Sequence, residues 1–180
     1  HGFNTDAEAI TRSIQEDLSI KIRGRSVLLL GAGGAGRTAA LKVASEGPAA
    51  IHLINRTRSK AEAVAGEIRA RNPEVVVSLE YPSGTVDLLM NATSLGLKPG
   101  DPLPLDEKHY ALSKAGAVYD MIYRPAETPL LKAARTAGCR VSNGLSMLLY
   151  QGAEALEIWS GRTAPVADMR EALKKNVYGS

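Results

Sequence analysis

The chain has 180 residues, enough for one domain with its own hydrophobic core, and 44% of them are apolar, which is ordinary for a globular protein. A net charge of +3 is too small to indicate a nucleic-acid-binding protein, and the single cysteine excludes a disulfide framework and a multi-cysteine zinc site. We find neither a signal peptide nor an apolar run long enough to span a bilayer, so we expect a cytoplasmic protein without membrane, nucleic-acid or metal partners.

Helical and strand-like patterns alternate along the chain. A first helix is predicted over 6–18, because Thr5 and Glu8 form a T-x-x-E capping box ahead of apolar residues that recur every four positions. A second capping box, Ser59 with Glu62, predicts the start of another helix. The helix that begins at this second capping box is expected to run to about residue 71. Further helices are expected over 34–46, 129–137, 145–160 and 166–176. Strands are expected over 26–30, 50–54, 75–79, 86–90, 117–121 and 139–143, with an irregular stretch over 91–116 that includes a short helix near 106–114.

This alternation predicts the fold class. Strands that alternate with helices form a parallel sheet with helices on both faces. The run SVLLL at 26–30 is apolar throughout, as is typical of a strand buried on both sides. About six strands suit an α/β, Rossmann-type, doubly wound sheet, which we expect to form a single domain over residues 1–180.

A glycine-rich loop follows the first predicted strand. The stretch LLLGAGGAGRTAA places Gly31, Gly33 and Gly36 at the G-x-G-x-x-G spacing, between a buried strand and a helix. Such glycines permit a tight turn, let the backbone approach a pyrophosphate and let helix and strand pack closely. We therefore expect the loop to bind a dinucleotide. Ala32, Gly34 and Ala35 of the same loop belong to this expected cofactor site. The alternative is a glycine-rich turn without a ligand.

The stretch INRTRSK at 54–60 carries three cations and no acid where a strand ends and a helix begins. Cations are unfavourable at a helix N-terminus, so an anion is expected nearby. The second strand ends at Asn55, where an acid would bind the ribose of NAD, and Arg56 follows, which suits the 2′-phosphate of NADP. Thr57 and Lys60 belong to the same expected cofactor site, and either Arg58 or Lys60 would add positive charge. We therefore predict that the cofactor is NADP rather than NAD. The alternative is a solvated basic turn.

Six motifs together make the chain similar to the cofactor-binding domain of shikimate dehydrogenases. They occur in the family's order and spacing, from one end of the chain to the other. They are NTD (4–6), GAGGAGR (31–37), NRT (55–57), NATSLG (91–96), YDMIYRPAETPLL (119–131) and GLSMLLYQGA (144–153). Six collinear motifs are far more specific than a glycine loop alone.

The resemblance implies an activity and site residues. Shikimate dehydrogenases are oxidoreductases that reduce 3-dehydroshikimate to shikimate with NADPH, in the chorismate pathway of aromatic amino-acid biosynthesis. Asp6 matches the aspartate that works with a lysine in proton transfer. Residues matched to the substrate site are Asn4, Thr5, Tyr123 and Gln151. Residues matched to the cofactor cleft, beyond the glycine loop and the NRT turn, are Asn91, Ala92, Thr93, Ser94, Met121, Gly144 and Met147.

The chain departs from the family in two ways. After NTD the family has a glycine-containing run, and here the residues are Ala7, Glu8 and Ala9. The chain also starts without methionine, and no lysine matches the catalytic one, so we expect a piece that lacks the N-terminal substrate domain. The helices over about 5–18 and 145–176 would pack on that domain. Such a piece should bind NADP(H) without turnover, and its parent could be fused to a dehydroquinate dehydratase.

Three other identities remain open. A quinate/shikimate relative with NAD or dual specificity would share the motifs. Glutamyl-tRNA reductase also combines a glycine loop with an Asn-Arg-Thr strand end, but it lacks the two terminal motifs. A non-catalytic NADP(H)-binding module would keep the glycine loop and would need neither Asp6 nor Gln151.

Overall fold

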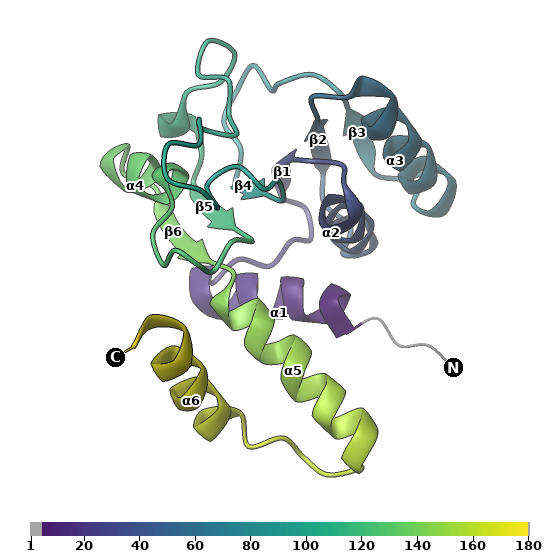
Figure 1. Ribbon diagram of the computed structural model, residues 1–180. Coiled ribbons are helices and arrows are strands. Elements are labelled where there is room, and N and C mark those ends of the chain that lie inside the picture. The colour runs from purple at the N-terminus through teal and green to yellow at the C-terminus, as the bar shows by residue number, and fades with distance from the viewer. Residues whose placement is uncertain (1–4, 180) are drawn as a thin grey trace.

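A six-stranded, all-parallel sheet forms the centre of the molecule (Figure 1). The computed structural model describes residues 5–179. The strands are β1 (Ser26–Leu30), β2 (Ala50–Ile54), β3 (Val76–Ser78), β4 (Leu88–Asn91), β5 (Ala117–Asp120) and β6 (Arg140–Asn143). Their order is β3-β2-β1-β4-β5-β6, so the chain reverses its direction of winding between β1 and β4. This order confirms the doubly wound fold, whose ligand crevice lies at that reversal.

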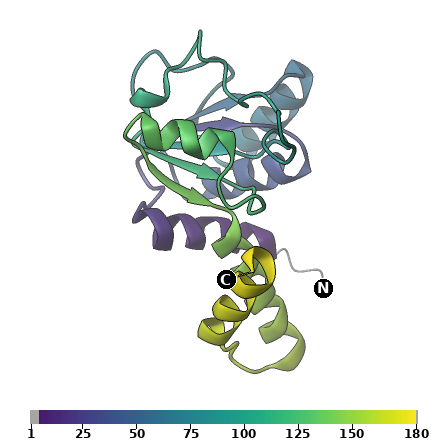
Figure 2. The same cartoon turned by 60° about the vertical axis from the view of Figure 1, so that its left-hand side comes forward.

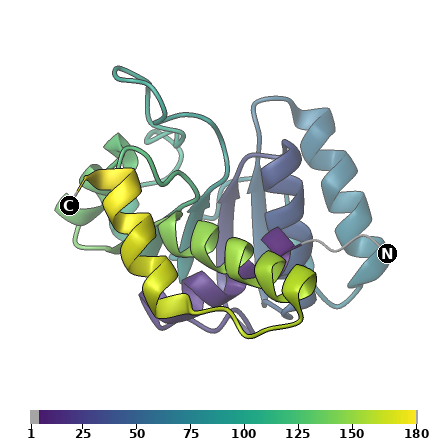
Figure 3. The ribbon, with the colours of Figure 1, turned by 60° about the horizontal axis from the view of Figure 1, so that its bottom comes forward.

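Helices cover the sheet unevenly. They are α1 (Thr5–Leu18), α2 (Gly34–Ser45), α3 (Arg58–Arg71), α4 (Pro129–Thr136), α5 (Leu145–Ser160) and α6 (Val166–Tyr178), with a 3₁₀ turn, η1 (Leu112–Lys114). One face is covered by α1, α2 and α3, and the other by α4, η1 and irregular chain. Helix α5 packs on α1, outside the sheet, and α6 packs on α5 (Figures 2 and 3).

The core consists of two apolar clusters, one on each face of the sheet. In β1, Val27 and Leu29 belong to the cluster under α1, α2 and α3, whereas Leu28 and Leu30 belong to the cluster under α4. Successive strand residues point to opposite faces, so a strand that is covered on both sides must be apolar at every position. This explains why the run at 26–30 predicted β1 so well.

Both predicted capping boxes are wrong. Thr5 is already helical, and the Glu8 carboxylate pairs with Lys42 of α2 at 2.7 Å, although a capping box needs Glu8 to accept from the Thr5 backbone. Helix α3 begins one residue before Ser59, and Glu62 pairs with Arg58. In both cases the glutamate forms a salt bridge, whereas the local pattern predicted that it would accept a hydrogen bond from a backbone N–H.

Several further elements differ in length from the sequence prediction, and three of them illustrate why. The strand over 75–79 shortens to β3, an edge strand whose Val76 side chain is 62% exposed. The strand over 86–90 begins later, at Leu88, and runs one residue further. The short helix near 106–114 is reduced to η1, because the chain before it forms turns around Asp106 instead.

No helix within residues 5–179 combines the length and the apolar character needed to cross a membrane. Over the same residues, no cluster of three His, Cys, Asp or Glu side chains is arranged to hold a metal ion.

Candidate functional site

The glycine loop joins β1 to α2 at the carboxyl edge of the sheet. Gly31 has a φ of +110°, a conformation that glycine adopts readily, and its N–H donates to the Ile54 carbonyl. A Cβ on Gly36 would lie 2.2 Å from the Gly31 carbonyl oxygen, so only glycine fits where α2 meets the strand. A Cβ on Gly33 or Gly34 would meet no atom within 4 Å, which leaves the backbone of the loop open to a ligand.

Asn55 connects the glycine loop to the turn after β2. Its Oδ1 accepts a hydrogen bond from the Ala32 N–H at 3.0 Å, and its Nδ2 donates to the Thr57 carbonyl at 2.8 Å. The side chain therefore holds two loops together. The exposed Arg56 comes next and so lies at the rim of the glycine loop.

The three cations of 54–60 differ in their partners. Arg58 pairs with Glu62 and, at 2.9 Å, with Glu80 at the end of the neighbouring edge strand. Within residues 5–179, no carboxylate forms a salt bridge with Arg56 or Lys60. The acid that the local sequence lacks is thus supplied to Arg58 alone, and Arg56 and Lys60 remain exposed without a carboxylate partner among the described residues.

A buried polar network lies at the ends of β4 and β5. The Asp120 carboxylate accepts hydrogen bonds from Asn91 Nδ2 at 2.9 Å, from the Ile122 N–H at 3.1 Å and from Thr128 Oγ1 at 2.6 Å. Asn91 Oδ1 in turn accepts from the N–H and the hydroxyl of Thr93. Burial raises the pKa of the Asp120 carboxyl, and the three hydrogen bonds oppose that rise. This network shapes the loops after both strands.

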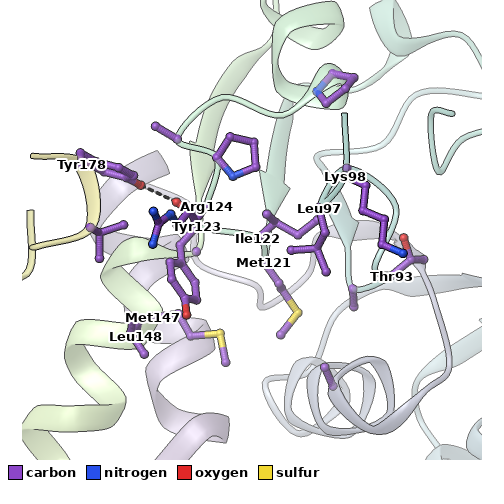
Figure 4. Close-up of a pocket in the computed structure, with 18 of the residues that line it drawn as sticks. Thr93, Leu97, Lys98, Met121, Ile122, Tyr123, Arg124, Met147, Leu148 and Tyr178 are labelled. Carbon is purple, nitrogen blue, oxygen red and sulfur yellow. Dashed lines mark hydrogen bonds between the residues drawn. The ribbon is translucent and has the colours of Figure 1, made fainter. Parts of the chain in front are cut away.

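A cavity of about 1270 Å³ opens between these loops and helices α1, α5 and α6 (Figure 4). Its lining includes many of the residues expected from the sequence: Asp6, Ala35, Ala92, Thr93, Met121, Tyr123, Gly144, Met147 and Gln151. Gly144 has no room for a side chain, because a Cβ there would lie 2.1 Å from the Met121 carbonyl oxygen. The cavity thus joins the first helix, the strand ends and α5 in one site.

Other expected residues lie outside this cavity. Gly33 and Gly34 are exposed next to Ala35 but do not line the cavity, and Gly31 and Gly36 are buried. The group Asn55, Arg56, Thr57 and Lys60 does not line it either. Asn91 is buried beneath the cavity wall, and Thr5 and the exposed Ser94 do not line it. Asn4 lies outside the residues that the structure describes.

Two family models match the chain: "Shikimate / quinate 5-dehydrogenase" over residues 12–95 and "Shikimate 5'-dehydrogenase C-terminal domain" over residues 144–174. The curated shikimate dehydrogenase (NADP(+)) of Natronomonas pharaonis is 41% identical over 177 residues, which cover 98% of this chain and 64% of that protein. The chain belongs to the shikimate dehydrogenase family.

Solved structures of similar proteins share the fold. Shikimate 5-dehydrogenase from Thermus thermophilus, in complex with NADP(H) and shikimate, is 34% identical, with a TM-score of 0.80 over 97% of this chain and 63% of that one. The ligand-free 5-ketofructose reductase of Gluconobacter sp. strain CHM43 is 36% identical, with a TM-score of 0.83 over 97% of this chain and 64% of that one. The chain spans less than two thirds of the length of these relatives.

Sequence reasoning on this chain missed several residues that shape the site. Asp120 and Thr128 belong to the motif YDMIYRPAETPLL (119–131). The sequence marks neither as a site residue, because a residue at the end of a strand or at a helix cap does not by itself indicate a hydrogen-bond network. Lys98, Arg124 and Tyr178 line the cavity as well. No local pattern connects Tyr178, near the end of the chain, with a loop more than 50 positions earlier.

Proposed function

We propose that this chain binds NADP(H) and serves as the cofactor-binding part of a dehydrogenase that reduces 3-dehydroshikimate to shikimate. One observation supports NADP(H) as the cofactor. Asn55 links the glycine loop to the turn in which Arg56 is exposed and has no carboxylate partner among the described residues. An arginine there suits a 2′-phosphate, and the absence of an acid at Asn55 disfavours NAD.

The residues present fit this cofactor. The open backbone at Gly33 and Gly34 leaves space for a pyrophosphate, and the N-terminus of α2 offers N–H groups and a favourable dipole. NADPH, when bound, supplies the hydride. Met121, Gly144 and Met147 line the cavity on the side of the sheet edge, where they would contact the nicotinamide.

The substrate side rests on Asp6, Tyr123 and Gln151, which line the same cavity. Asp6 would take part in proton transfer to the carbonyl oxygen, and Gln151 would donate or accept at a substrate hydroxyl. Both roles need the substrate carbon held against the cofactor. Because these side chains come from α1 and α5, the two helices would set the distance between substrate and nicotinamide.

A substrate domain would cover α1, α5 and α6. Apolar side chains at the end of α5 support this placement: Leu156, Ile158 and Trp159 are 38%, 39% and 84% exposed. The lysine that works with the family's aspartate has no counterpart among the matched motifs of this chain. These 180 residues would therefore bind NADP(H) without turning over shikimate. Fusion of a longer parent to a dehydroquinate dehydratase belongs to the same proposal.

Another ketone is a second candidate substrate. The 5-ketofructose reductase of Gluconobacter is as similar in fold to this chain as the shikimate enzymes are. The first family model also names quinate. A turnover assay on a chain that includes a substrate domain should therefore compare 3-dehydroshikimate, 3-dehydroquinate and 5-ketofructose.

Calorimetric titration of the chain with NADP⁺ and with NAD⁺ tests the cofactor. We expect NADP⁺ to bind at least about tenfold more tightly, which corresponds to roughly 1.4 kcal/mol for a charge-assisted contact. Arg56→Ser should remove most of that preference. Arg58→Ser is the matched control, because Arg58 is already paired with Glu80 and its loss should leave most of the preference in place.

Each other outcome contradicts part of the proposal. Equal binding of the two nucleotides would refute the role of Arg56 and favour a dual-specificity quinate/shikimate relative. Binding of neither nucleotide would refute the glycine loop as a cofactor site in these residues. Shikimate turnover by the chain alone, at the rate of a two-domain enzyme, would refute the need for a second domain.

A further inference from the structure

Helix α6 is an unusual wall for a cavity. None of its residues is fully buried, although the apolar side chains of Met169, Leu173 and Val177 are half-buried. Polar contacts also hold the helix at two places. Near its middle, Arg170 binds Glu16 of α1 at 2.6 Å and the Tyr150 hydroxyl of α5 at 2.9 Å. At its carboxyl end, Tyr178 reaches the sheet side of the cavity.

The Tyr178 hydroxyl bridges two segments that are far apart in sequence. It donates to the Tyr123 carbonyl oxygen at 2.7 Å, as the dashed line in Figure 4 marks, and accepts from Asn143 Nδ2 at 2.9 Å. Asn143 Nδ2 also donates to the Ala126 carbonyl at 2.8 Å. Burial raises the pKa of the Tyr178 hydroxyl further above neutrality, so the hydroxyl is protonated and able to donate at pH 7.

Hydrogen bonds thus hold the segment 121–126 at both of its ends. At its start, the Met121 N–H donates to the Asn91 carbonyl and the Ile122 N–H to Asp120. At its end, the carbonyls of Tyr123 and Ala126 are held by Tyr178 and Asn143. All six residues of the segment line the cavity, and the Tyr123 ring lies beside Met147 in Figure 4.

We propose that Tyr178 is a positioning residue: its hydroxyl fixes the Tyr123 carbonyl and thereby holds the segment 121–126 in the shape that the cavity requires. Helix α6 then stabilises the part of the cavity in which the nicotinamide would bind. Asn176 and Val177 of the same helix also line the cavity, so α6 serves as part of its wall. Only the ligand measurement below rests on the proposed function.

Amide hydrogen exchange of the ligand-free chain tests the proposal. Tyr178→Phe removes one hydroxyl and keeps the ring. We expect the amides of Met121, Ile122 and Gly144, whose N–H donates to the Ile122 carbonyl, to exchange about threefold to tenfold faster, as the loss of one hydrogen bond implies. Tyr110→Phe is the matched control, because the Tyr110 hydroxyl donates to the Lys114 carbonyl at 2.8 Å on the other face of the sheet.

Faster exchange confined to α6 would mean that Tyr178 supports only its own helix, and would overturn the proposal. So would equal acceleration at 121–126 in both variants, because that reports a general loss of stability. This measurement needs no ligand and therefore stands even if the cofactor proposal fails.

A second measurement compares two ligands. In Tyr178→Phe, the affinity for NADP⁺ should fall about threefold to tenfold, while adenosine 2′,5′-bisphosphate, which lacks nicotinamide, should bind as it does to the unaltered chain. An equal fall for both ligands would overturn a role at the nicotinamide end. If neither ligand binds the unaltered chain, the proposed function fails and the exchange experiment alone decides on Tyr178.

Discussion

The Oδ1 atom of Asn55 accepts a hydrogen bond from the backbone N–H of Ala32 at 3.0 Å. This contact sets the glycine loop against the end of β2, and the Nδ2 atom of the same side chain holds the Thr57 carbonyl. The Asn55 amide meets both needs, because its oxygen accepts on one side while its NH₂ group donates on the other. Asn55 therefore orders the loop as well as leaving the ribose position uncharged.

Asn55→Asp should weaken the preference for NADP⁺ over NAD⁺. The carboxylate keeps an acceptor for Ala32 but places a negative charge where the 2′-phosphate would lie, and charges a few ångströms apart near a surface repel by several kcal/mol. We expect NADP⁺ affinity to fall at least about tenfold and NAD⁺ affinity to fall less, measured by calorimetry. Asn72→Asp, at the far end of α3, controls for net charge. An unchanged NADP⁺ affinity would place the 2′-phosphate elsewhere.

Two glycines of the loop should respond differently to alanine. Gly36→Ala forces a Cβ against the Gly31 carbonyl oxygen, so we expect a loss of about 2–3 kcal/mol in the free energy of unfolding, measured in urea. Gly33→Ala meets no neighbouring atom and has a φ of −77°, which alanine tolerates, so stability should change little. Its methyl group should nevertheless weaken NADP⁺ binding, because it enters the space of the phosphate. Equal stability of the two variants would contradict the close approach at Gly36.

Thr128→Val should cost stability in a pH-dependent way. The substitution removes the hydroxyl that donates to Asp120 and caps α4 through the Leu131 N–H, and we expect a loss of about 2 kcal/mol at pH 7. The pKa of Asp120 is raised in the folded chain, so the folded state binds protons more strongly between the unfolded and folded pKa values. The contribution of Asp120 to the free energy of unfolding therefore falls as pH rises through that window. The fall is larger in the variant, because loss of the Thr128 hydrogen bond raises the pKa of Asp120 further.

Denaturation at pH 7 and at pH 5 measures this difference. Thr136→Val on the same helix is the control, because its hydroxyl donates to the exposed Lys132 carbonyl, and its cost should stay within about 0.5 kcal/mol. A loss in Thr128→Val that is the same at both pH values would show that the cost does not pass through the Asp120 carboxylate.

Local pattern was sufficient for most of the fold. The apolar run at 26–30 predicted β1, because a central parallel strand has no polar face, and the glycine spacing predicted the close approach at Gly36. The helix starts were less predictable. Glu8 reaches Lys42 on another helix, and a partner that far along the chain leaves no trace in a four-residue pattern.

The site was predictable where one motif carries it and unpredictable where distant segments meet. Several expected residues line one cavity because the carboxyl ends of parallel strands share an edge. Arg58 looked equivalent to Arg56 in the sequence, and its salt bridges with Glu62 and Glu80 separate the two. The bond from Tyr178 to Tyr123 depends on how α6 returns to the sheet, which no periodicity describes.

Helix α1 makes its most extensive helix contacts with α5, although more than a hundred residues separate them (Figure 1). During synthesis, α1 leaves the ribosome well before α5, so the side of α1 that packs on α5 stays uncovered until α5 has emerged. Contacts between segments so far apart form late, since a long loop must close before they are made. A chain interrupted before residue 145 would hold a nearly complete sheet and an uncovered helix, and would be a target for chaperones and proteases.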